Sequence, residues 1–237
     1  MEWLAARSSP TQIVLSRLQG DRLVRLLGVH PDRVEVVGRG IHAGDTAPRQ
    51  EVPGRVLHAG RLIPYKNVET VVKAFPRVRA RLPEAHLRII GDGPSLEAIG
   101  ALIDRLGAGA YVEVVPPVAS GDRILAELAS AQVLVQPSLR EGQGLIVLEA
   151  MQLGTPVVAA RSASSAVVDV VEHEVNGLLV DRPLEPGSWA DALVGLLHDR
   201  ARRERLATAA RATAAPFDWQ VIVTRLLEVY RRACARG

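Results

Sequence analysis

Two glutamates, Glu141 and Glu149, lie eight positions apart in a glycine-punctuated stretch that could bind an anionic, hydroxyl-rich ligand. The stretch covers residues 137–151 and reads PSLREGQGLIVLEAM. Gly142 and Gly144 permit a tight turn, and the apolar run after them predicts a helix. The free N–H groups at the start of that helix attract phosphate. Glu149 in its second turn points back toward the same end, because helical side chains tilt toward the N-terminus.

The pattern around Glu149 allows two interpretations. Its helical neighbours Ile146 and Leu153 are apolar. A carboxylate buried among such residues needs a partner, since an unpaired buried charge is very costly. A ligand hydroxyl would be such a partner, and the burial cost favours this interpretation. In the alternative, Glu149 is an ordinary residue on an exposed helix face.

A second group of candidate residues follows the first strand expected in the main unit. Residues 60–67 read GRLIPYKN, and only two of the 29 basic residues in the chain are lysines. Lys66 falls near a helix N-terminus, where a cation is disfavoured by roughly 0.3–1 kcal/mol. An anion bound between Arg61, Lys66 and the helix end would make a cation favourable at this position. A diphosphate clamp and a pair of solvated loop charges fit the pattern equally well.

Other motifs mainly exclude functions. Residues 91–94, GDGP, favour an ordinary turn between a strand and a helix, and His58 and His86 are interpreted as core or edge residues. No pair of His or Cys has metal-ligand spacing, and no Asp-x-Asp is present, so no metal site is expected. The GxGxxG, P-loop and GxSxG motifs are also missing, which disfavours NAD, ATP and serine-nucleophile chemistry.

Composition and charge are those of an ordinary globular protein. The chain is 48% hydrophobic and 23% charged, and its net charge of +3 comes without a basic tract, so no nucleic-acid partner is expected. The single Cys234 excludes an internal disulfide. With no signal peptide and no apolar run long enough to span a bilayer, we expect a cytoplasmic protein. Arg231 and Arg232 in the last helix leave open a peripheral position at the inner membrane face.

Strands and helices are expected to alternate along most of the chain. Apolar, β-branched runs predict strands at 55–60, 87–91, 112–115, 133–136, 156–160 and 177–180. Helical periodicity predicts helices at 67–82, 95–107, 121–131, 145–154, 165–173 and 188–198, and three further helices close the chain, the last at about 218–235. This alternation predicts an α/β fold with a doubly wound, Rossmann-like parallel sheet.

The first fifty residues form a separate, smaller pattern. A strand at 11–16, a helix at 20–28 and a strand at 34–37 precede a turn-rich linker at 38–53. Two strands and a helix cannot bury a core alone. We therefore divide the chain into a remnant of another α/β layer with its linker, residues 1–52, and a main domain, residues 53–237.

Taken together, these motifs resemble the donor-binding domain of GT-B glycosyltransferases, most closely the family known as group 1 or family 4. The resemblance covers about residues 55–235, while residues 8–42 resemble the segment that leads out of that family's N-terminal domain. The motifs that carry it are Gly60-Arg61-Leu62 with Lys66, Gly91-Asp92-Gly93-Pro94, Pro137-Ser138 with Glu141-Gly142 and Gly144-Leu145, Glu149-Ala150-Met151, Gly154 with Pro156-Val157-Val158, Asn176-Gly177-Leu178-Leu179-Val180, and Phe217-Asp218-Trp219.

The resemblance implies a role for each candidate residue. Arg61 and Lys66 would hold the donor diphosphate, Glu141 would contact the transferred sugar, and Glu149 would accept hydrogen bonds from the ribose. Further donor contacts are implied for Gly60, Asp92, Gly142, Gln143, Gly144 and Leu145, with the base near Asp92 and residues 115–116. The implied reaction moves a sugar from a nucleotide-diphospho-sugar, a co-substrate, to a sugar, lipid-linked or small-molecule acceptor. It is expected to retain anomeric configuration and to use neither metal nor cofactor.

Departures from the family pattern leave other functions open. Gln143 replaces a common Phe, and Ser165 to Asp169 replace a Gly-Gly-x-x-Glu stretch near the domain interface. In the family, an N-terminal half carries the acceptor site, so this chain is expected to need such a half, supplied separately if the chain is a fragment or one part of a two-chain enzyme. The alternatives are a non-catalytic nucleotide-sugar binding module, and a GT-B epimerase or phosphorylase.

Overall fold

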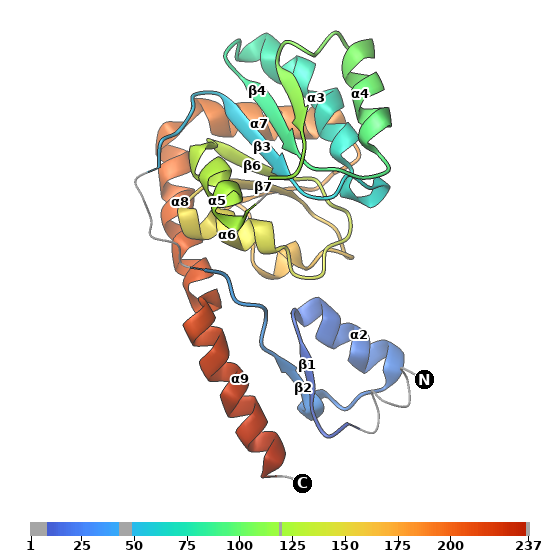
Figure 1. The fold of residues 1–237 in the computed structure, drawn as a ribbon, viewed down its shortest axis with the longest axis vertical. Coiled ribbons are helices and arrows are strands. Elements are labelled where there is room, and N and C mark those ends of the chain that lie inside the picture. The colour runs from blue at the N-terminus through green and yellow to red at the C-terminus, as the bar shows by residue number, and fades with distance from the viewer. Residues whose placement is uncertain (1–8, 43–48, 119, 236–237) are drawn as a thin grey trace.

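The computed structural model describes residues 9–42, 49–118 and 120–235, and its main feature is a six-stranded parallel sheet (Figure 1). The strands lie in the order β5-β4-β3-β6-β7-β8. Counted from β3, this is the 3-2-1-4-5-6 order of a doubly wound fold, which confirms the predicted fold class. The strands are β3 (Arg55–Ala59), β4 (His86–Ile90), β5 (Val112–Val115), β6 (Val133–Gln136), β7 (Val157–Ala160) and β8 (Leu178–Val180).

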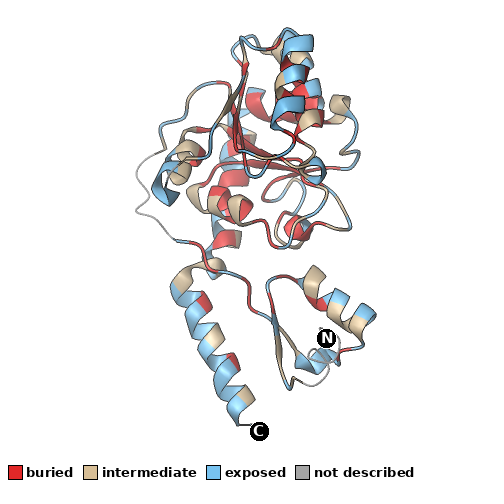
Figure 2. Cartoon of the chain, turned by 45° about the vertical axis from the view of Figure 1, so that its right-hand side comes forward, coloured by how far each residue is buried: buried red, intermediate tan, exposed pale blue. Residues whose placement is uncertain are grey.

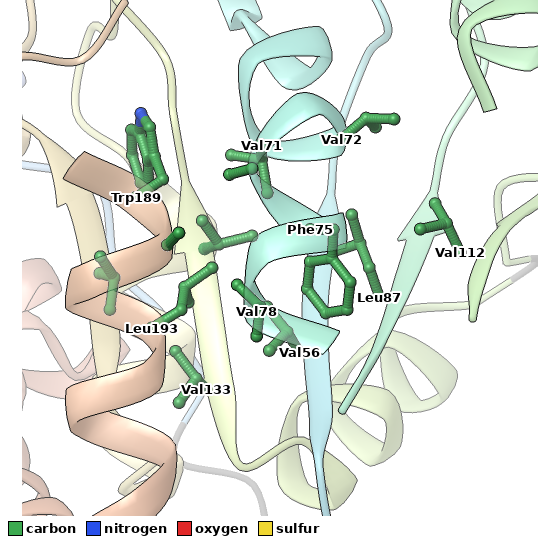
Figure 3. Close-up of a cluster of buried hydrophobic side chains, with 14 of the residues drawn as sticks. Val56, Val71, Val72, Phe75, Val78, Leu87, Val112, Val133, Trp189 and Leu193 are labelled. Atoms are coloured by element: carbon green, nitrogen blue, oxygen red, sulfur yellow. The ribbon is translucent and has the colours of Figure 1, made fainter. Parts of the chain in front are cut away.

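Helices cover both faces of the sheet, which explains why most residues of its strands are apolar and buried. Side chains alternate between the faces along each strand, so Val133 and Val135 of β6 point to one layer and Leu134 points to the other. The first layer contains α3 (Val68–Arg81), α4 (Leu96–Arg105) and α7 (Pro186–His198), and the second contains α5 (Gly121–Ser130), α6 (Leu145–Leu153) and α8 (Arg200–Ala214). Figure 3 shows the first layer, where the buried Trp189 and Phe75 pack beside the strands.

One predicted helix is wrong. Residues 165–173 contain only a short 3-10 helix, η3 (Ala166–Asp169). The segment is rich in valine, which is a poor helix former. Its backbone also forms a hydrogen bond with a residue outside the segment, because the Ala166 N–H donates to the Glu141 carbonyl at 3.0 Å. Asn176 also holds the segment, because its side chain donates to the Val170 carbonyl and accepts from the Glu172 N–H. The three closing helices are α8, the 3-10 helix η4 (Ala215–Phe217) and α9 (Trp219–Cys234).

The N-terminal residues form a small unit below the main sheet (Figure 1). It consists of β1 (Gln12–Val14), α2 (Arg17–Leu27), a 3-10 turn η1 (Pro31–Arg33) and β2 (Val34–Val36), with β1 and β2 paired in parallel. The two strands have no third partner among the described residues, and Ile13, Leu15, Leu26 and Val36 are exposed. Part of the predicted linker, residues 43–48, lies outside the described residues.

The last helix, α9, leaves the main domain and runs beside the N-terminal unit (Figure 2). Ile222 and Val229 pack with Val37 in a small buried cluster, and Arg232 donates to Glu35 at 2.9 Å. Val221, Leu227 and Tyr230 of the same helix are exposed. Within the described residues, no helix has the length and apolar character required to cross a membrane. A peripheral membrane position stays a prediction.

Candidate functional site

The candidate site lies beyond the carboxyl ends of β3 and β6, where the strand order reverses. Ligands of doubly wound sheets bind at this switch point. Two adjoining cavities of about 590 and 330 Å³ occupy it. Ala59, Gly60, Leu145 and Ile146 line both cavities and form the wall between them.

The sequence predicted one pocket, but the structure divides the candidate residues between these two cavities. Arg61, Asp92 and Glu149 line the larger one. Lys66, Glu141, Gly142, Gln143 and Gly144 line the smaller one. Gly60 and Leu145 lie on the shared wall, so a ligand that crosses this wall would meet both sets of residues.

Lys66 and Glu141, which both line the smaller cavity, form an ion pair. Lys66 donates to Oε1 of Glu141, and the buried Gln136 donates to the same oxygen at 2.7 Å. Both side chains of the pair are largely buried, with 16% and 13% exposed, so the pair is shielded from solvent. Oε2 of Glu141 has no hydrogen bond to any residue that the structure describes, which leaves it free to accept one from a ligand hydroxyl.

Glu149 is half-buried at the wall of the larger cavity. Within the described ranges it forms no hydrogen bond or ion pair. Burial raises the pKa of its carboxyl group above the usual 4.5, and the nearby charges of Arg39 and His42 oppose that rise. The alternative interpretation, an ordinary residue on an exposed helix face, is therefore wrong, because Glu149 is only partly exposed. The carboxylate is partly desolvated and lacks a fixed partner, which is the state expected of a ligand-binding acceptor.

The start of α6 faces the two cavities. Gly144 precedes its first residue with φ of +79°, and a β-carbon at this position would lie 2.9 Å from a methyl group of Val167. Glycine is therefore required here on two grounds, backbone conformation and space. Leu145 and Ile146 are the first two helical residues, and the N–H groups of a helix's first turn have no partner within the helix. They can bind an anion.

The loop after β4 joins the loop after β3. The Leu62 N–H donates to the Asp92 carbonyl at 2.8 Å, and the Asp92 carboxylate accepts from the Gly93 N–H at 2.7 Å. Asp92 also lines the larger cavity. The ordinary turn expected at residues 91–94 is confirmed. After β5, Pro117 and Val118 line the larger cavity, and the position of the base near residues 115–116 stays a prediction.

Sequence reasoning missed Arg39 and Gln136. Both line the smaller cavity, and Arg39 comes from the linker. Gln143 was predicted to contact the donor, but its buried side chain bonds the backbone of Arg39.

Asp169, which replaces a family glutamate, accepts from the Leu18 N–H of α2 at 3.2 Å and so fastens the N-terminal unit to η3. No local pattern in the sequence reveals these long-range contacts.

A further cavity of about 640 Å³ is lined by residues that precede β3 and β6 and by α8, and it is rich in arginine. Its guanidinium groups hydrogen-bond carbonyls near helix ends: Arg49 donates to Ala131 and Gly154, and Arg203 donates to Leu196 and Leu197. These arginines satisfy acceptors that helices leave unpaired at their C-termini. Arg49 and Arg203 therefore serve to hold these helix ends together.

Comparisons with known proteins agree with this geometry. Residues 47–213 match the family described as Glycosyl transferases group 1. The chain is 34% identical over 244 residues to a D-inositol 3-phosphate glycosyltransferase of Nocardioides sp., covering 92% of this chain and 52% of that protein. It is 35% identical over 162 residues to a sulfoquinovosyl transferase of Arabidopsis thaliana, covering 67% of this chain and 30% of that protein.

Solved structures share the fold. Sucrose-phosphate synthase from Thermosynechococcus elongatus aligns with a TM-score of 0.84 and 26% identity, covering 100% of this chain and 61% of the synthase. HepE of Anabaena in complex with UDP and glucose aligns with a TM-score of 0.83 and 23% identity, covering 96% of this chain and 64% of HepE. The chain spans about half the length of the curated relatives it matches. By its sequence and its fold, the chain belongs to the group 1 glycosyl transferases.

Proposed function

We propose that this chain binds a nucleotide-diphospho-sugar and supplies the donor half of a glycosyltransferase. The supporting observation is the arrangement at the switch point. Arg61 and the start of α6 border one cavity, Lys66 borders the next, and a shared wall joins them. A diphosphate lying across this wall would meet two cations and the positive end of a helix dipole.

In this proposal, each end of the donor has its own cavity. The nucleoside lies in the larger cavity, where Glu149 accepts hydrogen bonds from the ribose hydroxyls and Pro117 and Val118 contact the base. The sugar lies in the smaller cavity, where the free oxygen of Glu141 accepts from a sugar hydroxyl. Lys66 then exchanges part of its bond to Glu141 for one to the diphosphate.

The proposed chemistry is electrostatic. Departure of the nucleoside diphosphate concentrates negative charge on its terminal phosphate, and Arg61, Lys66 and the α6 N-terminus stabilise that charge. A divalent ion would then not be required, and the reaction would retain the anomeric configuration, as the family resemblance implies.

Transfer would also require an N-terminal half that binds the acceptor. The open two-stranded sheet of the N-terminal unit supports this part of the proposal. Two strands make a marginal sheet alone, and the exposed Ile13, Leu15 and Val36 are apolar surface suited to further strands or helices.

Calorimetry and transfer assays would test the proposal. The chain is expected to bind at least one of UDP, GDP or ADP without added divalent metal, and to transfer sugar once the N-terminal half of a related enzyme is added. Absence of binding to all three would contradict the donor role. Binding without transfer under any pairing would favour the binding module, whereas release of a free epimer or a sugar phosphate would favour an epimerase or phosphorylase.

A further inference from the structure

The side chain of Gln143 fastens the linker to the candidate site at Arg39. Its Oε1 accepts from the Arg39 N–H at 3.0 Å, and its Nε2 donates to the Arg39 carbonyl at 3.1 Å. The amide therefore pairs with both backbone groups of one residue, as a neighbouring strand would. Gln143 is 6% exposed, so water competes little for these bonds.

The backbone on both sides of Arg39 is fixed as well. Gly38 has φ of +79°, and a β-carbon at Gly40 would lie 2.5 Å from the Trp219 ring. Ile41 pairs with Asp218 in a parallel bridge and is buried in the main domain. Arg39 is thus held from both sides at the edge of the smaller cavity.

The Arg39 side chain, by contrast, has no hydrogen bond or ion pair in the ranges that the structure describes. Gln143 holds the backbone of Arg39, while the residue as a whole is exposed and lines the smaller cavity together with Lys66 and Glu141. Its charge also acts on Glu149, at the wall of the larger cavity. Lys66 is already paired with Glu141, whereas Arg39 is uncommitted.

We propose that Arg39 is a third donor-binding cation, supplied by the linker, and that Gln143 is the positioning residue that holds it at the cleft. The guanidinium group would donate to the diphosphate where it crosses the wall between the cavities, opposite Arg61. This inference rests on the proposed function. It adds that donor affinity depends on how the linker positions Arg39 at the cavity. It also gives Gln143 a role other than direct contact with the donor.

The test is calorimetry of the full chain with whichever of UDP, GDP or ADP binds most tightly. Arg39→Gln is expected to lower affinity about five-fold, because a partly exposed charge-assisted bond is lost. It should also reduce the salt dependence of binding. Arg25→Gln, which removes the same charge from the exposed last turn of α2, is expected to change neither.

A double-mutant cycle tests the role of Gln143. Gln143→Leu is expected to lower affinity about as much as Arg39→Gln, and the double variant is expected to be no weaker than either single variant. Additive losses would overturn the positioning role. Gln143→Glu, which keeps the acceptor for the Arg39 N–H, is the second variant if Gln143→Leu does not fold.

The outcomes separate this inference from the proposed function. If the unsubstituted chain binds no nucleoside diphosphate, the proposed function fails. If it binds one and Arg39→Gln matches Arg25→Gln in affinity and salt dependence, only the role of Arg39 is overturned.

Discussion

Glu149→Ala is expected to weaken nucleoside diphosphate binding about 100-fold, because two charge-assisted hydrogen bonds to the ribose are lost. Glu149→Gln keeps the shape and one acceptor oxygen, so its loss is expected to be about ten-fold. Calorimetry at neutral pH measures both. Glu97→Gln, on the exposed first turn of α4, is the matched control and is expected to bind as the unsubstituted chain does. Equal affinities for all four proteins would exclude the ribose role.

Glu149→Gln, which is expected to weaken donor binding, is expected to make the folded chain more stable. Burial raises the pKa of Glu149 in the folded chain above its unfolded value of 4.5, so at pH 7 folding must desolvate a carboxylate that has no fixed partner. Glu149→Gln should therefore raise the free energy of unfolding at pH 7. As pH falls through the raised pKa, the carboxyl group protonates, donor affinity falls and the stability difference between the two proteins shrinks. A variant that loses both affinity and stability would instead indicate a structural role.

His58 is expected to make the folded chain lose about 3 kcal/mol of stability as pH falls from 6.5 to 4. Burial lowers the pKa of His58 from 6.5 to about 4, against a smaller opposing effect of its bond to the Val135 carbonyl. The ring is 1% exposed, its Nδ1 lies 3.2 Å from that carbonyl, and its Nε2 has no partner within the described residues. Between pH 6.5 and 4 the unfolded chain binds a proton that the folded chain does not, so acidification favours unfolding.

Urea unfolding at several pH values measures this effect. His58→Asn keeps a donor for the Val135 carbonyl but does not titrate, so its stability should vary less with pH than that of the unsubstituted chain. Val135→Ala, a buried substitution next to it in space, is expected to lower stability at every pH and to keep the original slope. If His58→Asn retains the full slope, the titrating group lies elsewhere.

The fold could be predicted because its signals are local. Residues 133–135, which begin β6, are all apolar and buried, as is typical of a strand covered on both faces, and the structure places β6 at the centre of the sheet. The segment at residues 165–173 could not be predicted in this way. Its valines recur at helical spacing, but Asn176 and the Glu141 carbonyl, both outside the segment, capture its backbone groups.

The site was predicted only as far as its loops. Motifs at strand ends located Arg61, Lys66 and Glu149, because a parallel sheet brings those ends together. The division into two cavities depends on how Gly60 and Leu145 meet across the cleft, which sequence spacing does not encode. The bonds between Gln143 and Arg39 link residues 104 positions apart, and a glutamine in a loop gives no sign of such a partner.

The chain passes between the N-terminal unit and the main domain twice, and the two passages lie side by side. The linker makes the first at Ile41, and the start of α9 makes the second at Asp218. The Ile41 N–H donates to the Phe217 carbonyl at 2.8 Å, and the Trp219 N–H donates to the Ile41 carbonyl at 3.1 Å. The two crossings are therefore tied to each other, and the bond from the Leu18 N–H to Asp169 holds the N-terminal unit to the main domain at a further point. Movement of the N-terminal unit relative to the main domain would have to break that bond or stretch the two at Ile41.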